Sequence, residues 1–312
     1  MKILLLEPHN RCNCRCVMCD IWKRTDAREI GDAELARHID DIVSLGVERI
    51  VFSGGEPLMH SDLFRLAAPL RARGMRITLL TTGLLLERDA ARIVESIDEA
   101  IVSLDGPREI HDEIRRVGGA FDRLACGVGA IHRLRPGYPI SARCTVQGRN
   151  AAHLRATTAA ARAVGLASIS FLAADVESAA FDRTVAWPGA RKAAIVPELS
   201  ALEREIEGLI AEYPGDGFIL ETPAKLRRIV AHFRSHYGLE SPTAPRCNAP
   251  WVSAVWEAGG DIRPCFFHPP IGNTANGTLA QIVNGPAAIA FRENLNVAEN
   301  AVCRRCVCSL YL

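Results

Sequence analysis

The sequence of 312 residues has few aromatic side chains, no long hydrophobic run and no excess of either charge. Phe, Trp and Tyr make up only 6% of the residues, although 48% are hydrophobic, so aliphatic side chains must build most of a sizeable core. Lys and Arg number 37 against 36 Asp and Glu, a formal net charge of +1. This balance gives no support for a nucleic acid or a membrane surface as partner.

No stretch approaches the roughly 18 to 20 apolar residues that a membrane span needs. The N-terminal MKILLLEP is too short for a signal peptide, and Pro-His-Asn stands where small residues would mark a cleavage site. We therefore expect a cytoplasmic protein without a membrane partner. In that reducing compartment the eleven cysteines predict metal ligands or buried thiols rather than disulfides.

Short apolar runs alternate with segments of helical periodicity. We expect strands at 2–7, 49–54, 76–82, 100–105, 140–146 and 168–174, and helices at 31–46, 61–73, 88–97, 121–134 and 151–164. In the first of these helices, Asp32 is expected to cap the first turn, and Gly46 is expected to end the helix. Serial strand–helix units predict an α/β fold with a parallel sheet, either open or curved into a partial barrel. The functional loops then lie at the C-terminal ends of the strands.

Four cysteines stand in NRCNCRCVMCDIW, directly after the first expected strand. Cys12, Cys16 and Cys19 have x3 and x2 spacing, and Cys14 lies in the first gap. Three thiolates on a short loop can hold one face of an iron–sulfur cube and leave one iron open. Zinc bound by Cys14, Cys16, Cys19 and His9 is the alternative, although the second half of a zinc ribbon is missing. The spacing favours iron–sulfur over zinc.

This loop, together with SGGEP at 53–57 after the second strand, resembles the radical S-adenosylmethionine (radical SAM) superfamily. The resemblance covers about residues 1–175 and implies a partial (β/α)6 barrel. It implies that Cys12, Cys16 and Cys19 bind a [4Fe–4S] cluster whose open iron chelates SAM. Reduction by an external flavodoxin- or ferredoxin-type protein would then cleave SAM to a 5′-deoxyadenosyl radical, which removes a substrate hydrogen atom.

The SGGEP turn is expected to contact SAM. Gly54 and Gly55 leave no side chain between backbone and ligand, and Glu56 offers an acceptor for the methionyl ammonium. An ordinary strand-to-helix turn is the alternative. By the resemblance, Met18 would cover the adenine, with plain packing as the alternative, whereas Thr82 stands where the family commonly has Asn.

The segment VSLDGPREIHDEIRRVGGAFDR at 102–123 is also similar to radical SAM enzymes of the peptide-modifying kind. The resemblance places Ser103 near the SAM ribose or carboxylate and Arg115, or its neighbour Arg116, on the carboxylate. The alternative is a common turn with solvated arginines. In the fifth strand, alternation directs Arg143 into the barrel, where it would bind SAM, an anionic substrate group or a buried carboxylate.

After residue 176 the pattern changes to a polar connection with helices near 197–212 and 224–236. We expect a core at 1–176, a helical connection at 177–246 and a C-terminal domain at 247–312. Trp187, Arg183 and Arg191 would either cover the barrel mouth or belong to a surface connection.

The C-terminal part contains the other cysteine group. Two β-patterned runs, 252–257 and 261–267, predict a hairpin with Cys247 before it and Cys265 in its second run, and VCRRCVC adds Cys303 and Cys306. Four thiols make a closed site for either zinc or an iron–sulfur cluster.

This region resembles the auxiliary-cluster domain of radical SAM enzymes, in its SPASM or shortened twitch form. The resemblance implies that Cys247, Cys265, Cys303 and Cys306 bind an auxiliary [4Fe–4S] cluster. The low cysteine number favours the twitch form with one cluster. A saturated cluster suits electron transfer, so we expect dehydrogenation or bond formation; hydrogen donation by Cys308 or Cys14 would instead give an epimerase.

The substrate class is the least defined part. The first strand begins at residue 2 and leaves no room for a peptide-recognition domain, which favours a small molecule or sugar-like precursor. Modification of a peptide or protein is the alternative. A protein without enzymatic activity, either an iron–sulfur electron carrier or a zinc-binding module, would also use both cysteine groups.

Overall fold

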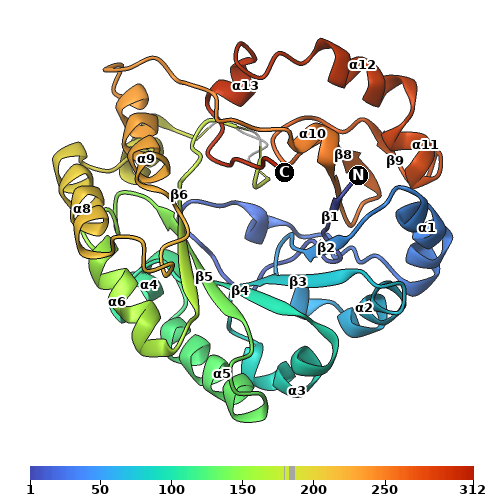
Figure 1. The fold of residues 1–312 in the computed structure, drawn as a ribbon, viewed down its shortest axis with the longest axis horizontal. Helices are drawn as coiled ribbons and strands as arrows, with labels where there is room; N and C mark the ends of the chain where they lie inside the picture. Colours follow the sequence, from blue (N-terminus) through green and yellow to red (C-terminus); the bar gives the residue numbers. More distant parts are fainter. Residues whose placement is uncertain (179, 183–186) are drawn as a thin grey trace.

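The structure, a computed structural model, describes residues 1–178, 180–182 and 187–312 (Figure 1). Its sheet has the strand order β6-β5-β4-β3-β2-β1-β7-β8-β9. The six predicted strands are confirmed and pair in parallel. They are β1 Ile3–Leu6, β2 Arg49–Phe52, β3 Arg76–Thr81, β4 Glu99–Ser103, β5 Ile140–Val146 and β6 Ser168–Ala173.

Helices follow the strands and lie around the outside of the curved sheet in Figure 1. Those of the first half are α1 Asp32–Ser44, α2 Leu63–Arg71, α3 Leu86–Ser96, α4 Arg108–Arg115, α5 Ala120–Leu134 and α6 Leu154–Val164, with short 3-10 turns η1 Ile21–Lys23 and η2 Pro57–Met59. In α1, Gly31 rather than Asp32 is the N-cap; Asp32 is the first helical residue, where its charge favours the helix dipole. Gly46 follows the helix with φ +69°, as predicted.

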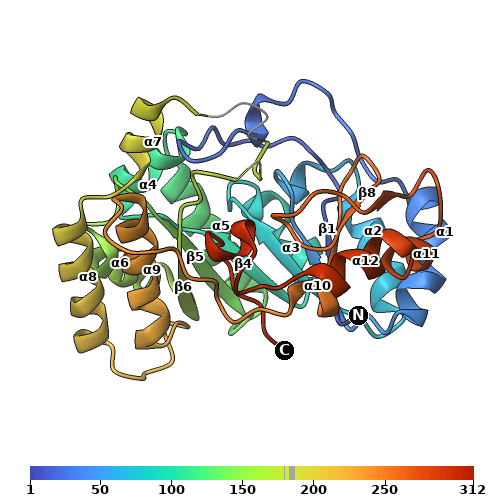
Figure 2. The ribbon, with the colours of Figure 1, turned by 90° about the horizontal axis from the view of Figure 1, so that it is seen from above.

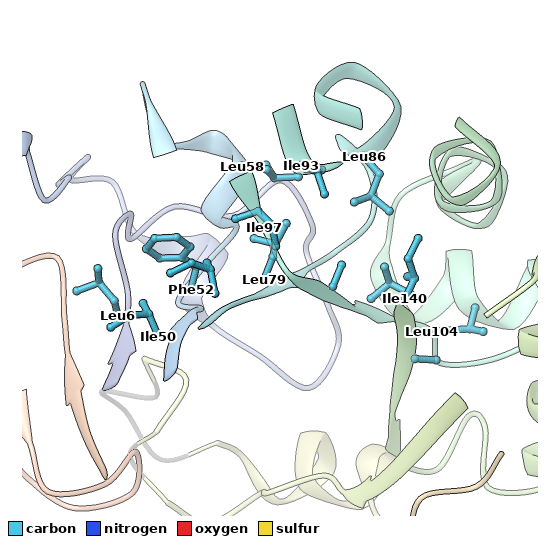
Figure 3. Close-up of a cluster of buried hydrophobic side chains, with 14 of the residues drawn as sticks. Leu6, Ile50, Phe52, Leu58, Leu79, Leu86, Ile93, Ile97, Leu104 and Ile140 are labelled. Carbon is cyan, nitrogen blue, oxygen red and sulfur yellow. The ribbon is translucent and has the colours of Figure 1, made fainter. Parts of the chain in front are cut away.

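The core lies between the sheet and these helices. Figure 3 shows Leu6, Ile50, Phe52, Leu79 and Ile140 from neighbouring strands among side chains of the helical layer. All five are completely buried. Alternation along β5 places Ser141, Arg143 and Thr145 on the other face of the sheet.

The C-terminal hairpin joins the core sheet. β7 Ser253–Trp256 pairs in parallel with β1, and β8 Asp261–Arg263 and β9 Gly272–Asn273 continue antiparallel. The second hairpin strand is shorter than predicted because Pro264 cannot donate to the ladder. β6 and β9 are the two edges, so the sheet is open rather than closed. The divisions after residues 176 and 246 stay predictions.

The remaining helices connect or cover this arrangement. They are α7 Gly189–Ile195, α8 Leu199–Glu212, α9 Pro223–His236, α10 Ala249–Val252, α11 Leu279–Val283, α12 Pro286–Asn294 and α13 Ala301–Arg304. Figure 2 shows α11 beside α1, where His38 Nδ1 accepts a hydrogen bond from Leu279 N. No helix within the described residues is long and apolar enough to cross a membrane.

Candidate functional site

The cysteine loop lies at the C-terminal end of β1 and is fixed to α4 through its backbone. Arg15 N donates to Arg115 O, and Val17 N to Ile114 O, each over 3.0 Å. Cys14 and Cys16 are buried, whereas Cys12 and Cys19 are partly exposed. The protein itself therefore sets the path of this loop.

A buried ion pair stands behind the loop. Arg115 Nη2 lies 2.5 Å from Asp105 Oδ2, and Arg115 Nη1 lies 3.5 Å from Cys16 Sγ. Burial raises the pKa of Asp105, and the guanidinium opposes that rise. The hydrogen bond from Cys14, with the charge of Arg115, lowers the pKa of Cys16 to about 6. Thus Arg115 contacts Asp105 and a loop thiol, partners that the sequence did not predict.

Sequence reasoning gave Asp105 no role, and placed it in a common turn only as the alternative interpretation. Its Oδ1 accepts a hydrogen bond from Thr145 N over 2.8 Å, and its backbone oxygen accepts one from Asn150 Nδ2 over 2.9 Å. The carboxylate therefore ties the ends of β4 and β5 to α4. The rival Arg116 is exposed and has left-handed backbone at the end of α4.

The two glycines after β2 are required by the cysteine loop. Gly54 has φ +99°, and a Cβ at Gly55 would lie 2.0 Å from Arg11 O. The backbone also connects the two motifs, because Glu56 N donates to Arg11 O over 2.8 Å. Close packing of protein on protein thus explains these glycines directly, rather than an approach to a ligand alone.

The carboxylate of Glu56 lies among protein hydrogen-bond donors. Its carboxylate is completely buried and accepts hydrogen bonds from Leu58 N (3.0 Å), Thr81 Oγ1 (2.8 Å) and Thr82 N (2.6 Å). Burial raises the pKa of Glu56, and these donors oppose the rise. Glu56 therefore caps η2 and ties it to the end of β3.

Thr82 connects the third strand to the cysteine loop. Its Oγ1 donates to Asn13 Oδ1 over 3.0 Å. Asn13, inside the loop, was not singled out from the sequence. The ends of β2 and β3 thus both contact residues 11–13.

Ser103 and Arg143 are register partners on β4 and β5. As predicted, Arg143 lies on the face opposite the buried Ala142 and Cys144, and it is exposed. Its Nε lies 3.4 Å from Ser170 Oγ. Burial raises the pKa of the Glu221 carboxyl, and the charge of Arg143 is among the influences that oppose this rise.

The connection after β6 covers the cysteine loop. Trp187 Nε1 donates to Asp20 Oδ2 over 2.7 Å, and Arg191 Nη2 donates to Asp20 Oδ1 over 2.8 Å. The guanidinium of Arg191 stacks on the Trp187 ring, with Cζ 3.7 Å from the ring centroid. Burial would raise the pKa of Asp20, but hydrogen bonds from Arg191, Trp187 and Lys23 lower it to about 2. Arg183 lies outside the described residues.

Met18 is buried in a small apolar cluster. The cluster combines the loop with α4 and the connection: Cys14, Cys16, Val17, Met18, Ile114, Ala174, Val176, Trp187 and Ile195. Met18 therefore packs among the apolar side chains of this cluster, to which Trp187 also belongs.

The C-terminal cysteines come from three separate segments: Cys247 before α10, Cys265 after β8, and Cys303 and Cys306 at α13. Burial, then the neighbouring Cys265 and Cys247 thiols, raise the pKa of Cys303 to about 11. His268, which the sequence did not single out, places Nε2 3.4 Å from Cys303 Sγ. Among the described residues, no three His, Cys, Asp or Glu side chains form a ready metal site.

Cys308 is accessible to solvent. Arg143, Cys265, Arg228 and Asp175 lie near its thiol. Cys14 is buried between Cys12 and Cys16. Either thiol thus keeps its place among the candidates for hydrogen donation.

The donors present fit iron–sulfur clusters. Both groups offer soft sulfur ligands, and Arg115 beside Cys16 favours the thiolate that such a cluster needs. The Asp105 ion pair fixes that guanidinium from behind.

Comparison with known proteins gives two family matches. Residues 6–142 match the radical SAM superfamily, and residues 247–307 match SPASM, an iron–sulfur cluster-binding domain. The two domains imply a [4Fe–4S] cluster, an auxiliary cluster and SAM.

Two relatives illustrate the range of similar proteins. Fe-coproporphyrin III synthase of Methanosarcina barkeri is 36% identical over 47% of this chain and 38% of its own length. PqqA peptide cyclase of Ruegeria pomeroyi is 25% identical over 97% of this chain and 79% of its own length. The chain spans less than half the length of the heme synthases that it matches.

Solved structures share the fold. Streptococcus suis SuiB bound to SAM superposes with a TM-score of 0.68 at 16% identity, over 99% of this chain and 72% of that one. Native anSMEcpe with bound SAM gives 0.71 at 17% identity, over 96% and 84%. The chain belongs to the radical SAM superfamily and contains a C-terminal SPASM-type iron–sulfur domain.

Proposed function

We propose that the protein uses SAM and two [4Fe–4S] clusters to oxidise a small molecule by dehydrogenation or bond formation. Cys12, Cys16 and Cys19 hold the first cluster and leave one iron for SAM; Cys247, Cys265, Cys303 and Cys306 hold the second. The supporting observation is the contrast between a three-cysteine loop fixed by Arg115 and a separate four-cysteine group. When bound and reduced, the first cluster with SAM supplies a 5′-deoxyadenosyl radical for hydrogen abstraction.

Residues of this chain would bind and orient SAM. Since Arg115 and Glu56 have internal partners, we assign the SAM carboxylate to Ser103 and Arg143, whose side chains share one face of neighbouring strands. The methionyl ammonium would contact the main chain of the Gly54–Gly55 turn, and Met18 would contact the adenine. An external one-electron protein of the flavodoxin or ferredoxin type would be the reductant.

Modification of a peptide is the second candidate. PqqA peptide cyclase aligns with 97% of this chain, whereas the heme synthases align with about half of it or less. The Fe-coproporphyrin III synthase is 36% identical, against 25% for the peptide cyclase, and this higher identity favours a small molecule as the substrate. Epimerisation with Cys308 or Cys14 as hydrogen donor would need no electron acceptor.

The test is anaerobic reconstitution with iron and sulfide, followed by reduction in the presence of SAM. We expect about eight irons per chain, from two four-iron clusters, and release of 5′-deoxyadenosine. Transfer of deuterium from a labelled compound into 5′-deoxyadenosine would identify the substrate. Full iron loading without 5′-deoxyadenosine, after a broad substrate screen, would favour an electron carrier. Zinc at the C-terminal cysteines would exclude the electron acceptor.

A further inference from the structure

A polar pocket lies between the glycine turn after β2 and the C-terminal hairpin. Its walls also include Glu7 and Asn10 after β1, the segment after the cysteine loop, and Phe181–Asp182 of the connection. If both clusters serve one reaction, the substrate must lie between the SAM site and the hairpin. The inference below therefore rests on the proposed function.

The positive charges of this pocket already have partners. Arg24 Nε lies 2.5 Å from Asp182 Oδ2, and Arg28 Nε lies 3.0 Å from Asp26 Oδ2. Arg263 forms an ion pair with Glu257. An anionic ligand would have to compete with these carboxylates.

Glu7 differs from the other acidic residues that line the pocket. Its backbone N donates to Trp256 O over 2.8 Å, which fixes the main chain beside β7. Its carboxylate has no hydrogen bond or ion pair with any residue that the structure describes. A Cβ at Gly54 would lie 3.0 Å from Glu7 Cβ, so the glycine turn packs directly against this side chain.

Asn10 is the second side chain with a missing partner. It is only 9% exposed, and its Oδ1 accepts a hydrogen bond from Arg28 N over 2.9 Å. Its Nδ2 is buried without a partner. Such an amide suits a ligand oxygen as acceptor.

The charges around Glu7 favour a cation. Burial, then the carboxylates of Glu257 and Asp182, raise the pKa of Glu7 to about 8, while Arg24 and Arg263 act in the opposite direction. Three arginines and four carboxylates line the pocket. They are Arg24, Arg28 and Arg263, and Glu7, Asp182, Glu257 and Asp261. A positive group beside Glu7 would stabilise its ionised form and balance this surplus.

We propose that this pocket binds a primary ammonium of the substrate against Glu7, with Asn10 donating to an oxygen of the same molecule. An amino sugar and the lysine side chain of a peptide both present such a group. The first source agrees with the small-molecule candidate function and the second with the peptide candidate.

The experiment is anaerobic calorimetry of the reconstituted enzyme with SAM at pH 7. The probes are glucosamine against N-acetylglucosamine, and a lysine-containing hexapeptide against the same peptide with norleucine. We expect one of the two amines to bind saturably. Its uncharged counterpart should bind with an affinity lower by about tenfold or more. Titration in buffers of different ionisation enthalpy should show release of close to one proton, because the ammonium lowers the pKa of Glu7 from about 8.

Glu7→Gln tests the assigned residue. It should weaken amine binding about tenfold or more and remove the proton release, whereas Glu87→Gln, on the exposed surface of α3, should do neither. Glu7→Asp keeps the charge and should retain proton release. Thermal melting of each variant checks the fold.

Three results would overturn the proposal: equal affinity for charged and uncharged probes, no saturable binding of either amine, or a Glu7→Gln variant that loses affinity for SAM but not for the amine. The last would assign the ammonium to SAM itself. The same preparation is assayed for 5′-deoxyadenosine, so loss of SAM cleavage, which contradicts the proposed function, is distinguishable from loss of amine binding.

Discussion

The two cysteine groups differ in what holds them in place. The loop at 12–19 is tied to α4 by backbone hydrogen bonds, to Arg115 through Cys16, and to the connection through Asp20. The C-terminal cysteines come from three separate segments, joined by such bonds as Arg228 to Cys306 O and His268 to Cys303. Protein contacts preorganise three thiols on one short loop in the first site, whereas a metal at the second would bind thiols from separate segments. A cluster with an open iron needs a preorganised site, because only three protein thiolates would hold it.

Cys16→Ala should have the largest effect. Loss of one of three ligands should abolish 5′-deoxyadenosine formation and remove about four of the eight irons. Cys126→Ala, at an exposed cysteine on α5, is the matched control and should keep both. Liquid chromatography and iron analysis provide the measurements. An unchanged yield from Cys16→Ala would contradict the loop assignment.

Cys303→Ala should separate the two sites. The auxiliary cluster should lose about four irons, and product formation should stop while SAM cleavage continues. The measurement is the ratio of 5′-deoxyadenosine to substrate-derived product. Loss of cleavage to the same extent as in Cys16→Ala would show that the sites do not act separately.

Arg115→Met probes the support behind the first site. It leaves Asp105 charged and buried without its partner, so we expect a loss of about 3–5 kcal/mol in the free energy of unfolding. Arg227→Met, which breaks an exposed pair with Glu207, should change stability much less. Urea denaturation of both variants is the measurement. Equal losses would show that the Asp105 pair has no special structural role.

The fold was largely predictable because local patterns determine it. The six core strands carry strand-length apolar runs, and each lies within about two residues of its predicted bounds. The pairing of β7 with β1 was not predictable, since no local signal relates Ser253–Trp256 to Ile3–Leu6 across some 250 residues. Pro264 shortened the second hairpin strand, which the apolar pattern alone did not show.

The site was predictable in its residue types but not in their partners. Spacing singled out the cysteines, and the resemblance to radical SAM enzymes singled out the glycine turn. Glu56 and Arg115, both expected on SAM, have protein partners in Thr82 and Asp105 that the sequence did not indicate, because the tertiary fold brings these partners near the buried charges. Asn13 and His268 carried no distinctive sequence signal.

Trp187→Phe should have the smallest effect and should act on the first site alone. The change keeps an aromatic ring over Arg191 but removes the indole donor to Asp20, so we expect a loss of about 1–2 kcal/mol in the free energy of unfolding. Because Asp20 adjoins Cys19, iron of the first cluster should leave faster to a chelator, while iron of the auxiliary cluster should leave at the parent rate. Trp251→Phe, at a half-exposed ring on α10, is the control. If Trp187→Phe accelerates loss from both clusters equally, the connection does not act as a support specific to the loop, and the preorganised nature of the first site must come from its ties to α4 and to the ends of β2 and β3.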